Sequence, residues 1–203
     1  MPADTGLHFT DLTALLGSRI CHDLISPLGA ISNGLELLAM SGVAPGPELS
    51  LISQSVQSAN ARIRFFRVTF GAASPGQTIG RVEVLGIVDD LARGGRLKID
   101  WQGPADLARA DVKMAFLALL CLETAMPYGG QVHVAATPSG WMIEAAAERL
   151  KIDPTLWDRL AGQVPAEPLA AAHIQFALLP DEARRLGRML RVRVGENRIA
   201  LEF

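Results

Sequence analysis

The sequence predicts an α+β protein whose N-terminal antiparallel helical hairpin pairs with a second copy to form a dimeric four-helix bundle. Three observations support this prediction. Residues 9–40 and 48–70 each repeat apolar side chains at intervals of three and four, as amphipathic helices do. The stretch between them, SGVAPGP at 41–47, is short and rich in Gly and Pro, which indicates a turn. From Thr78 onward, helical segments alternate with segments typical of β-hairpins.

The two N-terminal helices are expected to form one domain. Helix two carries a heptad-like apolar seam, which consists of Ile52, Val56, Ala59, Ile63, Phe66 and Phe70. A lone hairpin cannot cover its apolar stripes well, so we expect a homodimer through this domain. The stretch GAASPGQ at 71–77 reads as a linker. We therefore expect a hairpin domain in residues 1–75 and a second domain in residues 76–203.

The second domain is expected to combine helices with antiparallel hairpins. In chain order, we expect a helix at 82–92, a strand at 96–101, an apolar helix at 107–125, a hairpin at 131–146, a helix at 169–187 and a hairpin at 189–203. The hairpins are expected to turn at 138–140 and 195–197, where Gly, Pro or Asn occurs. This order of elements predicts an α/β sandwich domain.

Composition excludes several classes of function. The net charge of −2 predicts no broad nucleic-acid surface. Cys21 and Cys121 lie far apart in apolar helical contexts, which favours a reduced cytoplasmic protein over a disulfide scaffold. The N-terminus lacks the pattern of a signal peptide, and no apolar run has the ~18 residues that span a bilayer. We therefore expect a cytoplasmic protein that does not associate with membranes.

An ionisable pair, His22 and Asp23, interrupts the apolar pattern of the first helix. At about 100° per residue, the apolar stripe is centred nearly opposite His22, and the residues on the His22 face are mostly small or polar. Pro27 follows within the helix, where it removes a hydrogen bond and usually bends the axis. A costly residue beside an exposed histidine indicates a functional site, although a surface histidine without a role is the simpler alternative.

Two other kinds of site are disfavoured around His22. The side chains of Cys21 and His22 point about 100° apart on a helix, so they cannot form a nucleophile–base dyad. A zinc site needs three or four ligands, and the remaining histidines show no ligand spacing, so we expect no metal site.

The string CHDLISPLGAISNGLELL at 21–38 resembles the H-box of two-component histidine kinases and, more closely, the ChpT family of histidine phosphotransferases. The resemblance extends to a second domain like the histidine-kinase ATPase domain. It implies that His22 accepts a phosphoryl group, that Asp23 assists proton transfer and that Pro27 bends the helix. The surface that meets a partner would then comprise Leu15, Ser18, Arg19, Ile25, Ser26, Gly29 and Asn33.

The ATPase-like domain is expected to be degenerate. Kinases hold ATP with an Asn-bearing helix and glycine-rich boxes, but FLALLCLETAMPYGG at 116–130 has no Asn and offers only Glu123 for magnesium. The segments 145–153 and 162–179 contain no glycine cluster of the kind whose backbone N–H groups hold phosphates. We therefore expect a relay protein with no cofactor of its own. The alternatives are an ATP-dependent sensor histidine kinase and a non-catalytic dimeric scaffold.

The resemblance also implies the partners. The phosphoryl donor would be the receiver domain of a hybrid histidine kinase, and the acceptors would be response regulators of the CtrA and CpdR type. Magnesium (Mg²⁺) would be bound by the partner receiver domain and not by this chain.

Overall fold

The computed structural model describes residues 9–42, 46–138, 140–163 and 168–203. The chain divides into two compact units, Met1–Ala73 and Ser74–Phe203. The expected boundary between residues 75 and 76 lies two residues further along the chain. The α+β class is confirmed, with a helical hairpin in the first unit and a sheet backed by helices in the second.

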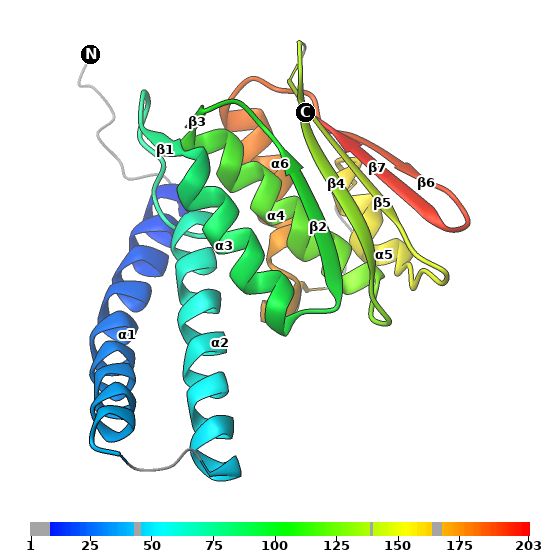
Figure 1. Cartoon of the computed structure of the whole chain (residues 1–203). Coiled ribbons are helices and arrows are strands. Elements are labelled where there is room, and N and C mark those ends of the chain that lie inside the picture. Colours follow the sequence, from blue (N-terminus) through cyan, green and yellow to red (C-terminus); the bar gives the residue numbers. More distant parts are fainter. Residues whose placement is uncertain (1–8, 43–45, 139, 164–167) are drawn as a thin grey trace, which may run out of the picture. The chain divides into compact units, whose positions relative to one another are not determined.

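The first unit is an antiparallel pair of long helices that lie side by side (Figure 1). Helix α1 spans Phe9–Met40 and helix α2 spans Pro47–Thr69, so both predicted helices are confirmed to within a residue. Pro47 stands at the first position of α2, where a missing backbone N–H costs nothing. Residues 43–45 of the connecting turn lie outside the described residues.

Small residues allow close packing between the two helices. A Cβ atom on Gly17 would lie 3.0 Å from the carbonyl oxygen of Phe70, so glycine allows the end of α2 to pack against α1. Ala14 and Cys21 are buried on α1, and Val56 and Ile63 are buried on α2. Cys21 lies about 100° around α1 from His22, so the covered flank of α1 begins beside the histidine face.

The α1 apolar stripe is left uncovered in the single chain, as expected for a lone hairpin. Five of its residues remain between 44% and 60% exposed, namely Leu16, Ile20, Leu24, Ile31 and Leu38. The physical reason is that α2 covers only the flank that contains Ala14 and Cys21, because one helix shields roughly a third of its neighbour's circumference. An apolar strip therefore continues along the hairpin from Leu16 to Leu38.

The second unit is a five-stranded mixed sheet in the order β2-β4-β5-β7-β6, with a separate two-stranded ladder of β1 and β3. The five strands are β2 at Leu97–Gln102, β4 at Gly130–Thr137, β5 at Gly140–Ala146, β6 at Arg191–Val194 and β7 at Arg198–Glu202. Strands β2 and β4 are parallel, and the other neighbours are antiparallel. The predicted hairpins 131–146 and 189–203 are confirmed.

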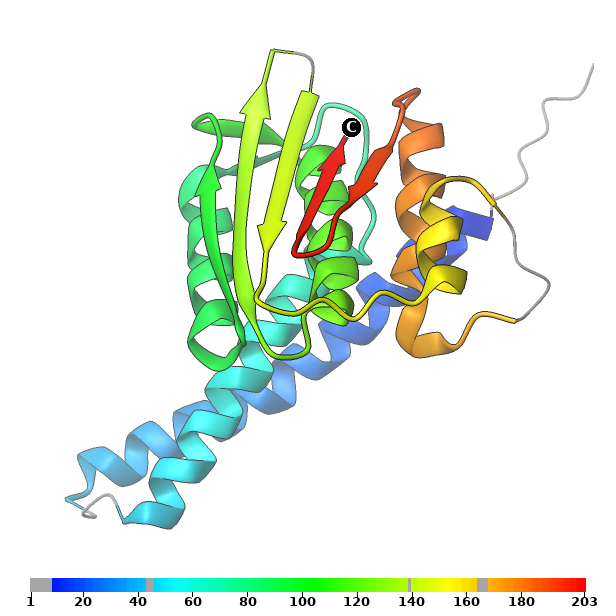
Figure 2. The same cartoon turned by 90° about the vertical axis from the view of Figure 1, so that its right-hand side faces the viewer.

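Helices cover one face of this sheet, which gives the expected sandwich (Figure 2). Helix α3 spans Arg81–Gly94, α4 spans Arg109–Ala125 and α6 spans Gln175–Arg185. Helix α4 connects the parallel strands and is buried almost all round, which explains its nearly unbroken apolar sequence. The opposite face of the sheet is open and forms a hollow of about 620 Å³, lined by charged side chains that include Lys98, Glu144 and Arg198.

Three short elements were not predicted. Strands β1 at Thr78–Gly80 and β3 at Asp106–Ala108 have three residues each, too few to show a period. Helix α5 at Pro154–Leu160 has seven residues. The helix expected at 169–187 is also corrected: a 3₁₀ turn at Ala171–His173 precedes α6, which begins only at Gln175.

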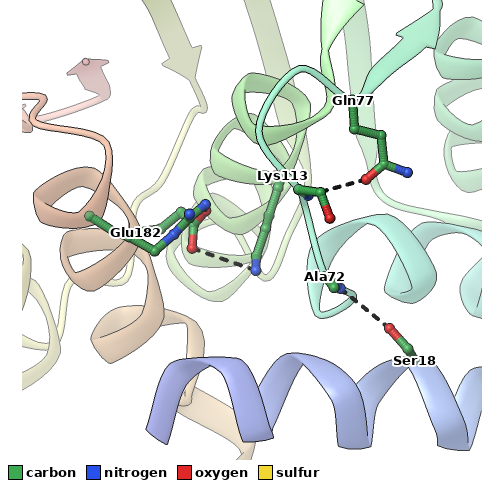
Figure 3. A network of polar contacts seen from close by, with 7 residues as sticks. Ser18, Ala72, Gln77, Lys113 and Glu182 are labelled. Atoms are coloured by element: carbon green, nitrogen blue, oxygen red, sulfur yellow. Dashed lines mark hydrogen bonds and ion pairs between the residues drawn. The ribbon is translucent and has the colours of Figure 1, made fainter. Parts of the chain in front are cut away.

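Helices α4 and α6 are joined by a buried ion pair. The Nζ atom of Lys113 lies 3.5 Å from Oε2 of Glu182, and both side chains are almost completely buried (Figure 3). Arg185 donates to the other Glu182 oxygen at 2.5 Å. Burial lowers the pKa of Lys113, and the charge of Glu182 opposes this shift. Phe176 and Leu179, which precede Glu182 on α6, are fully buried. Apolar packing therefore also holds α6 in place.

Candidate functional site

His22 projects from the middle of α1 into solvent, and its side chain is 83% exposed. The preceding residue, Cys21, is buried, and burial raises the pKa of its thiol. Cys21 therefore faces the protein interior while His22 faces solvent, which their separation of about 100° around the helix allows. The imidazole is accessible to a partner protein, whereas the thiol is not.

A carboxylate lies against one nitrogen of this imidazole. Nδ1 of His22 is 3.2 Å from Oδ1 of Asp23, and Nε of Arg19 donates to Oδ2 of the same carboxylate at 2.8 Å. The hydrogen bond from His22 is the main cause that lowers the pKa of Asp23. Desolvation is the next cause and raises this pKa, and the hydrogen bond and charge of Arg19 lower it further. Asp23 is therefore an anion throughout the neutral pH range.

The Asp23 carboxylate determines which form of the neutral imidazole fits this geometry. An ionised carboxylate only accepts hydrogen bonds, so the contact with Nδ1 requires a proton on Nδ1. In the neutral ring, Nε2 then carries the lone pair. A carboxylate on one nitrogen and an accessible lone pair on the other is the arrangement of a nucleophile whose developing charge is compensated.

The other predicted partner-binding residues lie on the same side of α1. Leu15, Ile25, Ser26 and Asn33 are exposed, and a Cβ atom on Gly29 would meet nothing within 4 Å. The face around His22 is therefore open, as its small and polar residues suggest. Within this predicted surface, Arg19 is joined to the His22–Asp23 pair by a hydrogen bond to the carboxylate.

Ser18 has a structural contact that the sequence did not reveal. Its Oγ atom accepts a hydrogen bond from the backbone N–H of Ala72 at 3.3 Å, which fastens the end of the hairpin to α1 (Figure 3). Gly71 permits this approach, because a Cβ there would lie 2.2 Å from the Arg67 carbonyl oxygen and 3.3 Å from Ser18 Oγ. Ser18 is half-buried, so it borders the open face and also stabilises the hairpin.

Pro27 lies within α1, and the helix continues past it. Proline has no N–H, so the carbonyl oxygen four residues earlier, that of Asp23, loses its intrahelical donor. One backbone hydrogen bond of α1 is therefore missing at Asp23, the residue whose side chain contacts the imidazole.

Within the described ranges, His, Cys, Asp and Glu side chains form no group of three or more that can hold a metal ion. No described helix is both long and apolar enough to cross a membrane.

Comparisons with known proteins find relatives of this chain over most of its length. The family model for the histidine phosphotransferase C-terminal domain matches residues 81–198. The protein phosphotransferase ChpT of Brucella abortus (strain 2308) is 37% identical over 182 residues, covering 85% of this chain and 87% of that protein. A solved structure of a bacterial phosphotransferase is 30% identical, with a TM-score of 0.69 and 97% of each chain covered. The family model covers only the second unit, so the assignment of His22 depends on the H-box and on the geometry above.

Proposed function

The chain belongs to the histidine phosphotransferase family and is a phosphotransferase, and from this premise we propose that His22 carries the phosphoryl group in a two-component phosphorelay. The single observation that carries the proposal is an 83% exposed imidazole whose Nδ1 contacts a carboxylate, on an open face of a helix. A non-catalytic scaffold has no need of this arrangement.

In the proposed transfer, the donor is an aspartyl phosphate on a receiver domain. The Nε2 lone pair of His22 attacks phosphorus, an N–P bond forms, and the P–O bond to the donor aspartate breaks to release its carboxylate. The ring becomes a cation that retains its Nδ1 proton, and Asp23 at 3.2 Å stabilises that charge. In the second half, an acceptor carboxylate attacks phosphorus, and the N–P electron pair returns to Nε2.

The second unit supports a relay rather than a kinase. The segments that hold ATP in kinases would correspond to α4 and to the region before α6, and these lack the Asn and the glycine clusters. Helices α4 and α6 instead pack together through the Lys113–Glu182 pair and through Gln175, which donates to Thr124 at 3.3 Å. We propose that the chain needs no cofactor of its own and that magnesium is bound by the receiver.

The receiver must cover the face around His22 to bring its aspartate to the ring. We propose that Leu15 and Ile25 supply apolar contact there, while Ser26 and Gly29 keep the surface low enough for close approach. The donor would be a hybrid-kinase receiver and the acceptors response regulators of the CtrA and CpdR type, in a cytoplasmic pathway.

Parallel incubation of the protein with a phosphorylated receiver and with labelled ATP tests the function. Transfer of label from the receiver and none from ATP is expected, because the lone pair is accessible but glycine-rich phosphate loops are absent from the sequence. Gly29→Arg should slow transfer by steric exclusion. Ser41→Arg adds the same side chain just past the end of α1, about 28 Å from His22 along the helix axis, and should not slow transfer. Labelling by ATP alone would contradict the relay.

The exposed apolar strip on α1 supports the proposal of a homodimer through the hairpins. Burying such side chains contributes about 25 cal/mol for each Å² removed from water, and a second hairpin can cover the strip. We expect light scattering at micromolar concentration to give about twice the 21.7 kDa chain mass. Ile31→Glu should shift the mass toward that of one chain. Leu37→Glu, exposed but about 120° away from Ile31, should leave the dimer intact. A parent of single-chain mass would refute the bundle.

A further inference from the structure

We propose that Arg19 is a positioning residue that holds Asp23 against His22 and so keeps the imidazole proton on Nδ1. This inference rests on the proposed function of His22 and adds Arg19 as a residue that acts on His22 through Asp23. It begins from one carboxylate with two contacts: Asp23 Oδ1 is 3.2 Å from His22 Nδ1, and Oδ2 accepts from Arg19 Nε at 2.8 Å.

Asp23 needs a second contact to keep its carboxylate against the imidazole. Its side chain is 48% exposed, and its position next to His22 in sequence places its Cβ about 100° around the helix. Without a second contact, the carboxylate can rotate into water and leave the imidazole. Free neutral histidine favours the proton on Nε2, the form that has no lone pair at the outward nitrogen. A carboxylate fixed at Nδ1 reverses that preference.

Arg19 is suited to this task by spacing and by chemistry. It lies four residues before Asp23, so the two side chains meet on one face of the helix. A guanidinium stays charged at every pH of interest and donates in a fixed plane, so it orients the carboxylate as well as attracting it. Arg19 also contributes to the lowered pKa of Asp23, which keeps both carboxylate oxygens available as acceptors.

A different role for Arg19 would be direct contact with the phosphoryl group. The recorded contact of Arg19 is with Asp23, and it exists in the unphosphorylated protein. The two roles therefore differ in a measurable way. A positioning residue changes the His22 tautomer before any phosphate is present, whereas a phosphate-binding residue does not.

The test is nitrogen NMR of the full chain with ¹⁵N-labelled histidine, at a pH where the His22 ring is neutral. The ring shifts of Nδ1 and Nε2 report the tautomer, and the His22→Ala spectrum assigns the His22 signals among the four histidines. We expect the parent to hold the proton mainly on Nδ1. Arg19→Ala should move it toward Nε2, and Arg19→Lys, which keeps the charge, should restore part of the difference. Transfer from a phosphorylated receiver should fall roughly two- to threefold in Arg19→Ala, as expected for an exposed helical ion pair.

Arg184→Ala is the matched control. Arg184 is 74% exposed, as Arg19 is, and it also contacts a carboxylate on its own helix, that of Asp181 at 2.9 Å. This variant should leave the His22 shifts unchanged. An identical tautomer in Arg19→Ala and in the parent would overturn the inference, whatever happens to the transfer rate. That result would leave the proposed function intact, because phosphorylation of His22→Ala is what would refute the function.

Discussion

Replacement of His22 by alanine is expected to reduce phosphoryl acceptance from a receiver to the background of the assay, while the protein remains folded. The imidazole is the nucleophile in the proposed transfer, and the described part of α1 holds no second histidine that could replace it. His22 makes no core contact, being 83% exposed, so its loss should change the free energy of unfolding by no more than about 0.5 kcal/mol. Gel autoradiography measures the transfer, and urea denaturation followed by circular dichroism measures the stability.

His133 provides a matched control for this experiment. Its Nδ1 lies 2.8 Å from a carboxylate oxygen of Asp100, so it has the same kind of partner as His22, but it lies on strand β4 in the second unit. His133→Ala should accept label at the parental rate. Undiminished labelling of His22→Ala, or loss of labelling in His133→Ala, would show that the H-box histidine is not the acceptor.

Replacement of Glu182 by leucine is expected to destabilise the second unit by about 3 kcal/mol, because it leaves the buried Lys113 ammonium without its carboxylate partner. Lys113→Met combined with Glu182→Leu should recover most of this loss, since two apolar side chains of similar volume replace the pair. The midpoint of urea denaturation, followed by circular dichroism, measures both effects.

The pH dependence of the Glu182→Leu variant follows from the same lysine. Burial already lowers the pKa of Lys113 from 10.5, and removal of Glu182 takes away the charge that opposes this shift. Between the lowered pKa of the folded state and the ordinary value of 10.5, the unfolded chain then binds more protons than the folded one, so the free energy of unfolding should rise as the pH is raised through this interval. Asp181→Leu, which removes a partly exposed carboxylate from the same helix, should show neither effect. Equal stability of Glu182→Leu and the parent would mean that α4 and α6 are held without the pair.

The hairpin was predictable almost to the residue because its signals are local and repeated. Helix α1 carries a strong three-and-four pattern over 32 residues, and Gly and Pro mark the turn. Helix α5 was missed although Asp153 and Pro154 form a capping signal, in which the Asp153 carboxylate accepts from the Thr155 N–H. Seven residues with a cap but little periodicity do not stand out from a loop.

The candidate site was predictable in its type and only partly in its contacts. His22 and Asp23 stand out in the sequence as an ionisable pair, and the resemblance to the H-box implies that His22 accepts the phosphoryl group. The Arg19–Asp23 pair also has a sequence signal, the spacing of four on a helix, but on the sequence alone Arg19 is placed only in the surface that meets a partner. The contacts of Ser18 with Ala72 and of Lys113 with Glu182 join residues far apart in the chain, and no periodic pattern encodes them.

The two edges of the sheet in the second unit bear on how copies of the protein associate. Strands β2 and β6 each have one neighbour, so each presents unpaired backbone groups to which a strand of another molecule can add. Lys98 and Asp100 on β2, and Arg191 and Arg193 on β6, place charges along these edges. Charged side chains on edge strands are a common protection against open-ended sheet growth, and a second copy of β6 added there would bring the arginines of two molecules into repulsion. These charged edges leave the exposed apolar strip of the hairpin as the surface through which the proposed homodimer would form.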